Sequence, residues 1–128
     1  MDVKGKKALV FGGTSGIGLA TVMQLQAGGA DVVAISRDPS KAGDISGVTL
    51  RGCDVRDADA LTALFQAEGP FDILISAATG GSRAAGPFLK MDMAGFQGSF
   101  DKLWGDTNVV RLGAEHLSEH GSIVLVSG

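Results

Sequence analysis

Short apolar runs alternate along this chain with segments of helical spacing, and this alternation constrains the fold more than any other feature. The runs cover residues 7–11, 31–36, 48–53, 71–76 and 122–127. In most of these runs the apolar residues run together instead of alternating with polar ones, which is typical of strands buried on both faces. Strands that alternate with helices predict a parallel, doubly wound α/β sheet, and right-handed crossovers then place helices on both faces.

The connection after the first run predicts a helix. Ile17, Ala20, Thr21 and Leu25 recur at helical spacing and form an apolar stripe. The pair Gly28-Gly29 follows this stripe and is typical of a helix C-terminus, because glycine readily adopts the conformations that end a helix.

The two later connections also predict helices. Asp57 is placed to cap the first of them, and Gly69-Pro70 ends it. The other, residues 79–121, opens with glycines and then keeps helical spacing as far as Leu117. We find no internal repeat and no linker, so 128 residues predict one domain around one sizeable core.

The segment GGTSGIG, residues 12–18, joins the first run to the first helix. Gly12, Gly16 and Gly18 fall in the turn and the first helical residues, where glycine permits left-handed φ values and lets backbone N–H groups close on a ligand. A helix N-terminus also carries partial positive charge, so the segment predicts a site for the pyrophosphate of a dinucleotide. A plain tight turn between strand and helix is the alternative.

These residues resemble the short-chain dehydrogenase/reductase family, whose loop usually reads T-G-x-x-x-G-I-G. The resemblance implies a three-layer Rossmann-type doubly wound parallel sheet of five strands in the order 3-2-1-4-5. It also implies that residues 1–128 are a partial NAD(P)-binding domain, truncated relative to the family, with the C-terminal catalytic and substrate portion absent. Further stretches match the family in order: ISRD at 35–38, CDV at 53–55, FDILISAAT at 71–79 and SIVLVSG at 122–128.

Ser36 and Arg37 end the second run, where family members approach the adenosine ribose. An acid there would accept a hydrogen bond from a free 2′-hydroxyl, whereas a guanidinium matches a 2′-phosphate in charge and geometry. NADP(H) is therefore favoured over NAD(H). A surface arginine without a ligand is the alternative, and Asp38 complicates the assignment because it places an acid one residue further on.

The resemblance further implies that Asp54 accepts from the adenine amino group while Val55 flanks the ring. Taken from the residues alone, Asp54 is equally well explained as a strand-end residue that caps the next turn. The predicted cofactor-binding residues are Gly12, Thr14, Ser15, Gly16, Ile17, Gly18, Ser36, Arg37, Asp54, Val55, Ala77, Ala78 and Thr79.

The family's usual proton donor, the tyrosine of Y-x-x-x-K, is missing because the chain contains no tyrosine. Gly128 stands where the family has a serine that orients the substrate, and Ser127, one residue earlier on a strand, would point to the opposite face. Lys102 lies near the position of the family's asparagine and is a catalytic candidate that could donate a proton or bind a phosphate. The alternative for Lys102 is a solvated helix charge.

Other conspicuous residues are expected to be structural. Cys53, the single cysteine, is expected to be a small buried hydrophobic residue and not a reactive thiol. His116 and His120 have the spacing of a helical ligand pair, but we favour a solvated helix terminus over a metal site. Residues 80–83 predict a mobile loop near the nicotinamide end.

The net charge of −3 with scattered lysines and arginines argues against a nucleic-acid partner. No apolar run approaches the roughly 18 residues that cross a bilayer, and no signal-peptide pattern opens the chain. We therefore expect no membrane partner, and a soluble protein in the cytoplasm.

By resemblance, the parent protein is expected to be an oxidoreductase that transfers hydride between NADP(H) and an alcohol or carbonyl substrate. Two alternatives stay open. One is a non-catalytic nucleotide-binding or regulatory relative, and the other is an inactive fragment stabilised by self-association. Family members commonly associate through the long third helix, and the last strand would be an open edge, so a homo-oligomer is expected.

Overall fold

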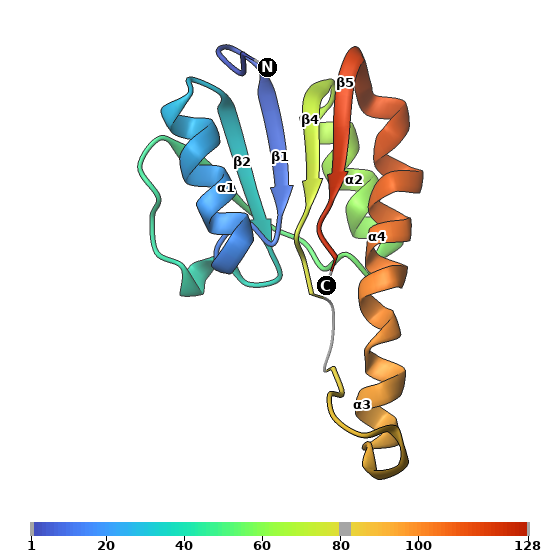
Figure 1. Cartoon of the computed structure of the whole chain (residues 1–128). Coiled ribbons are helices and arrows are strands. Elements are labelled where there is room, and N and C mark those ends of the chain that lie inside the picture. Colours follow the sequence, from blue (N-terminus) through green and yellow to red (C-terminus); the bar gives the residue numbers. More distant parts are fainter. Residues whose placement is uncertain (1, 80–82, 128) are drawn as a thin grey trace.

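The computed structural model describes residues 2–79 and 83–127, and a five-stranded parallel sheet forms its centre. The strands follow the spatial order β3-β2-β1-β4-β5, and every pairing is parallel (Figure 1). This arrangement confirms the doubly wound sheet and its expected order. The strands are β1 (Lys7–Phe11), β2 (Asp31–Ser36), β3 (Val48–Gly52), β4 (Phe71–Ser76) and β5 (Leu117–Leu125).

Helices cover both faces of the sheet, which gives three layers (Figure 1). Helix α1 (Gly16–Ala27) lies on one face, and α2 (Ala58–Glu68) and α4 (Phe100–Gly113) lie on the other. The short helix α3 (Met93–Gly98) precedes α4, and both extend beyond the C-terminal ends of the strands. Three 3-10 turns complete the described elements: Pro39–Lys41, Phe88–Lys90 and Ala114–His116.

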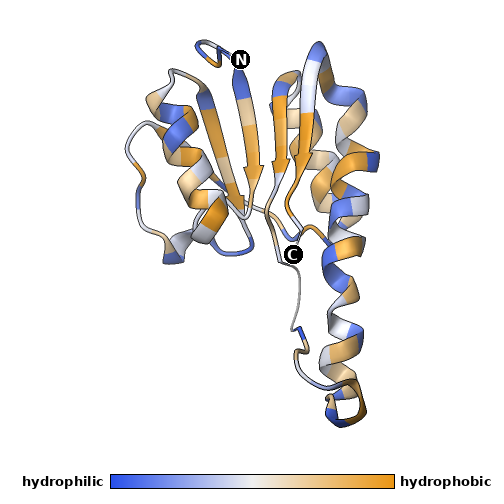
Figure 2. Ribbon diagram, in the orientation of Figure 1, coloured by the Kyte–Doolittle hydropathy of each residue, from blue (hydrophilic) through white to orange (hydrophobic). Residues whose placement is uncertain are grey.

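Successive residues of the central strands point into two separate cores, one under each helical layer. In β1, Phe11 packs with Phe65 of α2, with ring centroids 5.7 Å apart, while Val10 joins the cluster that contains Val22 of α1. Apolar residues are accordingly concentrated in the strands (Figure 2). Strands β1, β2 and β4 are buried as expected, but the edge strands β3 and β5 are only partly covered, because each has a neighbour on one side.

Helix α1 turns a different face to the sheet than its apolar stripe predicts. Gly18 and Val22 are its buried residues, whereas Ile17 is 65% exposed and Ala20 is exposed. The reason is the close approach of the helix to the preceding loop. A Cβ at Gly18 would overlap the carbonyl oxygen of Gly12 and lie 2.6 Å from its carbonyl carbon. Gly18, which has no side chain, therefore determines which face of α1 packs against the loop and the sheet.

The segment after β4 also departs from the prediction of one continuous helical pattern. Helix α4 ends at Gly113, and Leu117, which was expected in the helix, begins β5. Strand β5 thus starts five residues before residue 122, and an irregularity in its pairing with β4 explains why the sequence did not reveal this earlier part. Phe71 pairs with Leu117, but Ile73 pairs with Ser122, so the residues between them form extra backbone that hides the strand period.

His116 and His120 therefore do not share a helical face. His116 ends a 3-10 turn and its ring stacks on Phe65 at a centroid distance of 6.2 Å, while His120 is exposed in β5. The expectation of a solvated helix terminus is wrong for His116, since its ring is part of the packing around Phe65. Within residues 2–79 and 83–127, no group of three or more His, Cys, Asp or Glu side chains is arranged to hold a metal ion.

Cys53 lies in the core beneath α2, as predicted, and burial is the main cause that raises the pKa of its thiol to about 11. The carboxylates of Asp57 and Asp54 act in the same direction. In the described part of the chain, no helix is both long and apolar enough to cross a membrane.

Candidate functional site

The loop between β1 and α1 meets the ends of β2, β3 and β4 at the C-terminal edge of the sheet. Two cavities open there on either side of Ala78, which lines both. The first, here the β2-side cavity, reaches from Gly12 to Arg37 and Asp54. The second, the β5-side cavity, reaches from Gly16 to Lys102 and Ser127. Strand order reverses between β1 and β4, and ligands of doubly wound sheets bind in such a crevice.

Most of the predicted cofactor-binding residues line one cavity or both. Gly18 is the exception, because it is buried under Gly12 and serves the packing of α1. Those that line at least one cavity are Gly12, Thr14, Ser15, Gly16, Ile17, Ser36, Arg37, Asp54, Val55, Ala77, Ala78 and Thr79.

Glycine is required at two positions of the loop for backbone reasons. Gly12 has a φ of 74° and Gly16 a φ of 53°, which are left-handed values that side chains disfavour. Gly12 also lies directly against the next strand, since an added Cβ would be 2.7 Å from the carbonyl carbon of Ala77 and from the nitrogen of Ala78. The loop therefore packs on the peptide that joins Ala77 and Ala78.

The backbone N–H groups of the loop fall into two sets. Those of Gly12 and Gly13 donate to the carbonyl oxygen of Ile35, at 2.8 and 3.2 Å, and so fasten the loop to β2. The N–H groups of Gly16, Ile17 and Gly18 have no acceptor in the part of the chain that the structure describes. The first turn of α1 can therefore donate to an anion, where the helix dipole adds attraction.

The end of β2 presents a hydroxyl and a guanidinium to the β2-side cavity. The Oγ of Ser36 is buried and has no partner among the described residues, and Arg37 forms no ion pair within the same set. Asp38 does not compete for this position, because its carboxylate caps the following 3-10 turn. It accepts from the N–H of Ser40 at 3.2 Å and from the Ser40 hydroxyl, and the bond from that hydroxyl is the main cause that lowers the pKa of Asp38.

Lys41 and Arg37 line one further cavity at the mouth of the cleft, together with Thr14 and Ser36. Sequence reasoning missed Lys41, which has no motif around it. The 3-10 turn that brings Lys41 back toward the end of β2 is a consequence of the Asp38 cap.

Asp54 is held by its own turn. Its Oδ1 accepts from the backbone N–H of Arg56 at 2.9 Å and from Nε at 3.1 Å, and its Oδ2 accepts from Nη2 at 2.9 Å. The Arg56 side chain is the main cause that lowers the pKa of Asp54. These contacts match the turn-capping explanation, and the adenine contact stays a prediction. Arg56 also lies 3.4 Å from Asp101 of α4, and Asn108 of α4 donates to the Val55 carbonyl at 3.0 Å.

Lys102 is not a solvated helix charge, so that alternative is wrong. Its side chain is only 16% exposed, and its Nζ donates to the carbonyl oxygen of Ala78 at 3.0 Å and to Asp106 at 3.3 Å. Asp106 in turn accepts from the hydroxyl of Ser76 at 2.6 Å. The spacing of four residues between Lys102 and Asp106 was visible in the sequence, but the contacts with β4 were not.

Ser127 lines the β5-side cavity, as does Lys102, and the expectation that its side chain would face away stays a prediction. The expectation assumed strand alternation, but β5 ends at Leu125, so the alternation does not extend to Ser127. Arg83 lines the same cavity. Of the predicted mobile loop at residues 80–83, residues 80–82 lie outside the described residues, as does Gly128 with its predicted role.

The chain matches the model of a family described as short chain dehydrogenase over residues 6–128. Among curated proteins, an L-xylulose reductase of Mesocricetus auratus is 35% identical over 105 residues, which are 79% of this chain and 42% of that protein. A 2-keto-3-deoxy-L-fuconate dehydrogenase of Xanthomonas campestris is 33% identical over 102 residues, which are 77% of this chain and 33% of that protein.

Solved structures give the same result. A short chain dehydrogenase/reductase family protein superposes with a TM-score of 0.82 at 35% identity, covering 99% of this chain and 57% of that one. A short chain dehydrogenase from Burkholderia cenocepacia in complex with NADP has a TM-score of 0.81 at 27% identity, covering 98% of this chain and 56% of that one. The chain thus spans about half the length of these structures and less than half of the two curated relatives.

Proposed function

The chain belongs to the short-chain dehydrogenase/reductase family, and from this premise we propose that it is the NADP(H)-binding portion of an oxidoreductase. The parent enzyme would transfer hydride between the nicotinamide cofactor and an alcohol or carbonyl substrate. The observation that carries this proposal is that the N–H groups of Gly16, Ile17 and Gly18 have no acceptor among the described residues, which leaves them as donors for an anion. A pyrophosphate bound there would complete the first turn of α1.

The remaining residues fit a dinucleotide that extends in both directions from the loop. Toward β3, Asp54 and Val55 would receive the adenine. Toward β5, the backbone of Ala77, Ala78 and Thr79 would line the nicotinamide ribose. Bound NADP(H) would supply the hydride, while the residues of this chain bind and orient it.

Three features of the β2 end favour NADP(H) over NAD(H). Arg37 has no ion-pair partner among the described residues, Ser36 keeps a buried hydroxyl without a partner, and Lys41 adds a second cation at the cleft mouth. The Asp38 carboxylate accepts from Ser40, so it is already engaged and does not take the position of an acid that would accept from a free 2′-hydroxyl. A phosphate would thus meet two cations and an available hydroxyl.

Calorimetric titration of the chain with NADPH and NADH tests this proposal. Replacing Arg37 with alanine is expected to weaken NADPH binding at least about tenfold, because charge-assisted hydrogen bonds are lost, and to leave NADH binding nearly unchanged. Arg111→Ala removes the same side chain from the exposed end of α4 and serves as the control. Equal weakening of both nucleotides would contradict the specificity assignment, and no binding of either would contradict the whole proposal.

A non-catalytic nucleotide-binding relative is the second candidate, and the contacts of Lys102 favour it. Lys102 is the remaining candidate for a proton donor, but its ammonium already donates to Ala78 and Asp106. Nucleotide binding without reduction of a panel of carbonyl compounds would support the second candidate. Measurable NADPH oxidation by the same chain would contradict it.

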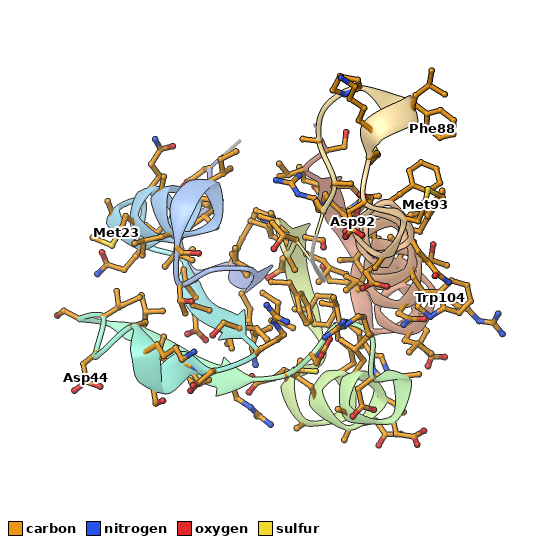
Figure 3. The ribbon with its side chains drawn as sticks, turned by 90° about the horizontal axis from the view of Figure 1, so that it is seen from below. Met23, Asp44, Phe88, Asp92, Met93 and Trp104 are labelled. Carbon is orange, nitrogen blue, oxygen red and sulfur yellow. The ribbon has the colours of Figure 1, made fainter. Side chains whose placement is uncertain are left out.

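We also propose self-association through α4, and a cytoplasmic location. Phe100, Leu103 and Trp104 are 55%, 66% and 62% exposed on this helix, and Trp104 is directed away from the sheet (Figure 3). An apolar face of this kind favours burial against another surface. Light scattering that reports a monomer for the chain would contradict this part of the proposal.

A further inference from the structure

Lys102 and Asp106, one helical turn apart in the N-terminal half of α4, form a closed set of contacts with the end of β4. Asp106 accepts from the hydroxyl of Ser76, the last residue of the strand, at 2.6 Å. Lys102 donates to the carbonyl oxygen of Ala78, two residues further on, at 3.0 Å. The contact of 3.3 Å between Lys102 and Asp106 closes the set. Two side chains of one helix thus hold two points of one strand end.

This set of contacts lies away from solvent. Ser76 is 1% exposed, and the side chains of Lys102 and Asp106 are 16% and 13% exposed. Water therefore screens the charges little. Removing Lys102 takes away the hydrogen bond to the Ala78 carbonyl and the contact with Asp106, while the bond from Ser76 to Asp106 remains. A substitution of Lys102 is therefore expected to change the position of the Ala78 carbonyl.

The opposite side of the same segment packs on the glycine loop. The N–H of Ala77 donates to the Phe11 carbonyl at 2.8 Å, and a Cβ at Gly12 would meet the peptide of Ala77 and Ala78 at 2.7 Å. Ala78 lies beyond the last residue of β4, and its carbonyl is held by Lys102. Ala78 is therefore held from α4 through its own carbonyl oxygen, while the peptide that precedes it, between Ala77 and Ala78, lies against Gly12.

We propose that Lys102 and Asp106 are positioning residues that hold the end of β4 against the glycine loop and so set the shape of the β5-side cavity. This inference rests on the proposed function, because that cavity is where the nicotinamide half of NADP(H) would lie. Lys102 then acts through the Ala78 carbonyl, which it holds in place. Asp106 orients the ammonium and joins it to Ser76.

The test compares two ligands that differ in their reach. NADPH would occupy both cavities, whereas adenosine 2′,5′-bisphosphate lacks the nicotinamide half and would occupy only the β2 side. Lys102→Met is expected to weaken NADPH about tenfold, because a charge-assisted bond to the cavity wall is lost. Binding of adenosine 2′,5′-bisphosphate should stay within about twofold, since a perturbation confined to the other cavity costs it little. Lys102→Arg keeps a cationic donor and should restore most of the NADPH affinity.

Two further variants keep the test interpretable. Asp106→Asn leaves an acceptor for Ser76 but removes the negative charge beside Lys102. It should weaken the binding of NADPH more than that of adenosine 2′,5′-bisphosphate, and it keeps the test usable if Lys102→Met destabilises the chain. Lys90→Met makes the same substitution on an exposed turn and should change neither affinity. Unchanged NADPH binding by Lys102→Met and Asp106→Asn, or an equal loss of both ligands in folded protein, would overturn the inference. Failure of the unmodified chain to bind either ligand would overturn the proposed function itself.

Discussion

Replacing Gly18 with alanine tests whether close packing or helix propensity controls the glycine loop. Gly18 lies within α1, so propensity alone predicts that alanine would stabilise the chain by up to about 1 kcal/mol. The structure predicts the opposite. The new Cβ would overlap the Gly12 carbonyl oxygen and lie 2.6 Å from its carbon, and backbone atoms do not approach a real Cβ within 3.0 Å.

The loop cannot relieve this overlap by moving, because Gly12 already touches the peptide of Ala77 and Ala78 on its other side. Helix α1 must therefore move away from the sheet, which loosens the packing of Val22. Overpacking of this kind costs about 1–3 kcal/mol, so after the propensity gain we expect a net loss of about 1–2 kcal/mol in the free energy of unfolding. For a chain of this length the melting temperature would fall by about 5 °C.

Thermal unfolding followed by circular dichroism measures this effect. Ala20→Gly, at an exposed position of the same helix, calibrates the propensity contribution and should lower stability by about 1 kcal/mol. If Gly18→Ala were as stable as the unmodified chain or more stable, propensity would dominate and the close-packing argument would be refuted. Weaker NADPH binding by the same variant is expected because the N–H groups of Gly16 and Ile17 would shift with α1.

Two further predictions follow from titratable groups. Burial, and after it the nearby acids Asp57 and Asp54, raises the pKa of Cys53 from 9.0 to about 11. Alkylation of its thiol below pH 9 should therefore be slow in the native chain and fast in denaturant. Equal alkylation rates in the two states would contradict the burial of Cys53. Because the unfolded thiol ionises first, stability should fall as the pH rises from 9 toward 11. Burial of Glu68 is outweighed by hydrogen bonds from Lys7 and Arg51, which lower its pKa below 4.5. Glu68→Gln should therefore reduce the free energy of unfolding, measured by urea titration, by up to about 1 kcal/mol at neutral pH. This difference should vanish as the pH falls below 4.5 and through the pKa of Glu68 in the folded chain. An equal loss of stability in acid would contradict the ion-pair explanation.

Strands β1, β2 and β4 could be located from the sequence because each is a central strand whose apolar run coincides with its paired residues. Strand β5 was located less accurately. Its N-terminal part, from Leu117, carries polar residues and an irregular register, so it lacks the periodicity by which a strand is recognised. The cap at Asp57 was predictable because its side chain accepts from Ala60, three residues away.

The candidate site divides in the same way. The glycine loop and the end of β2 were predictable because their chemistry depends on residues adjacent in the chain. Asp106 and Asn108 were missed, since their partners Ser76 and Val55 lie 30 and 53 residues away. The cofactor roles of the predicted residues stay predictions until binding is measured.

The sequence by itself determined the order of strands and helices, the glycine loop and the cap at Asp57, because backbone preference and nearest-neighbour hydrogen bonds act over a few residues. Only the tertiary structure decided that α1 packs through Gly18 and that Lys102 reaches the end of β4. Both contacts depend on the distance between segments that are far apart in the sequence, and the packing of the whole core sets that distance.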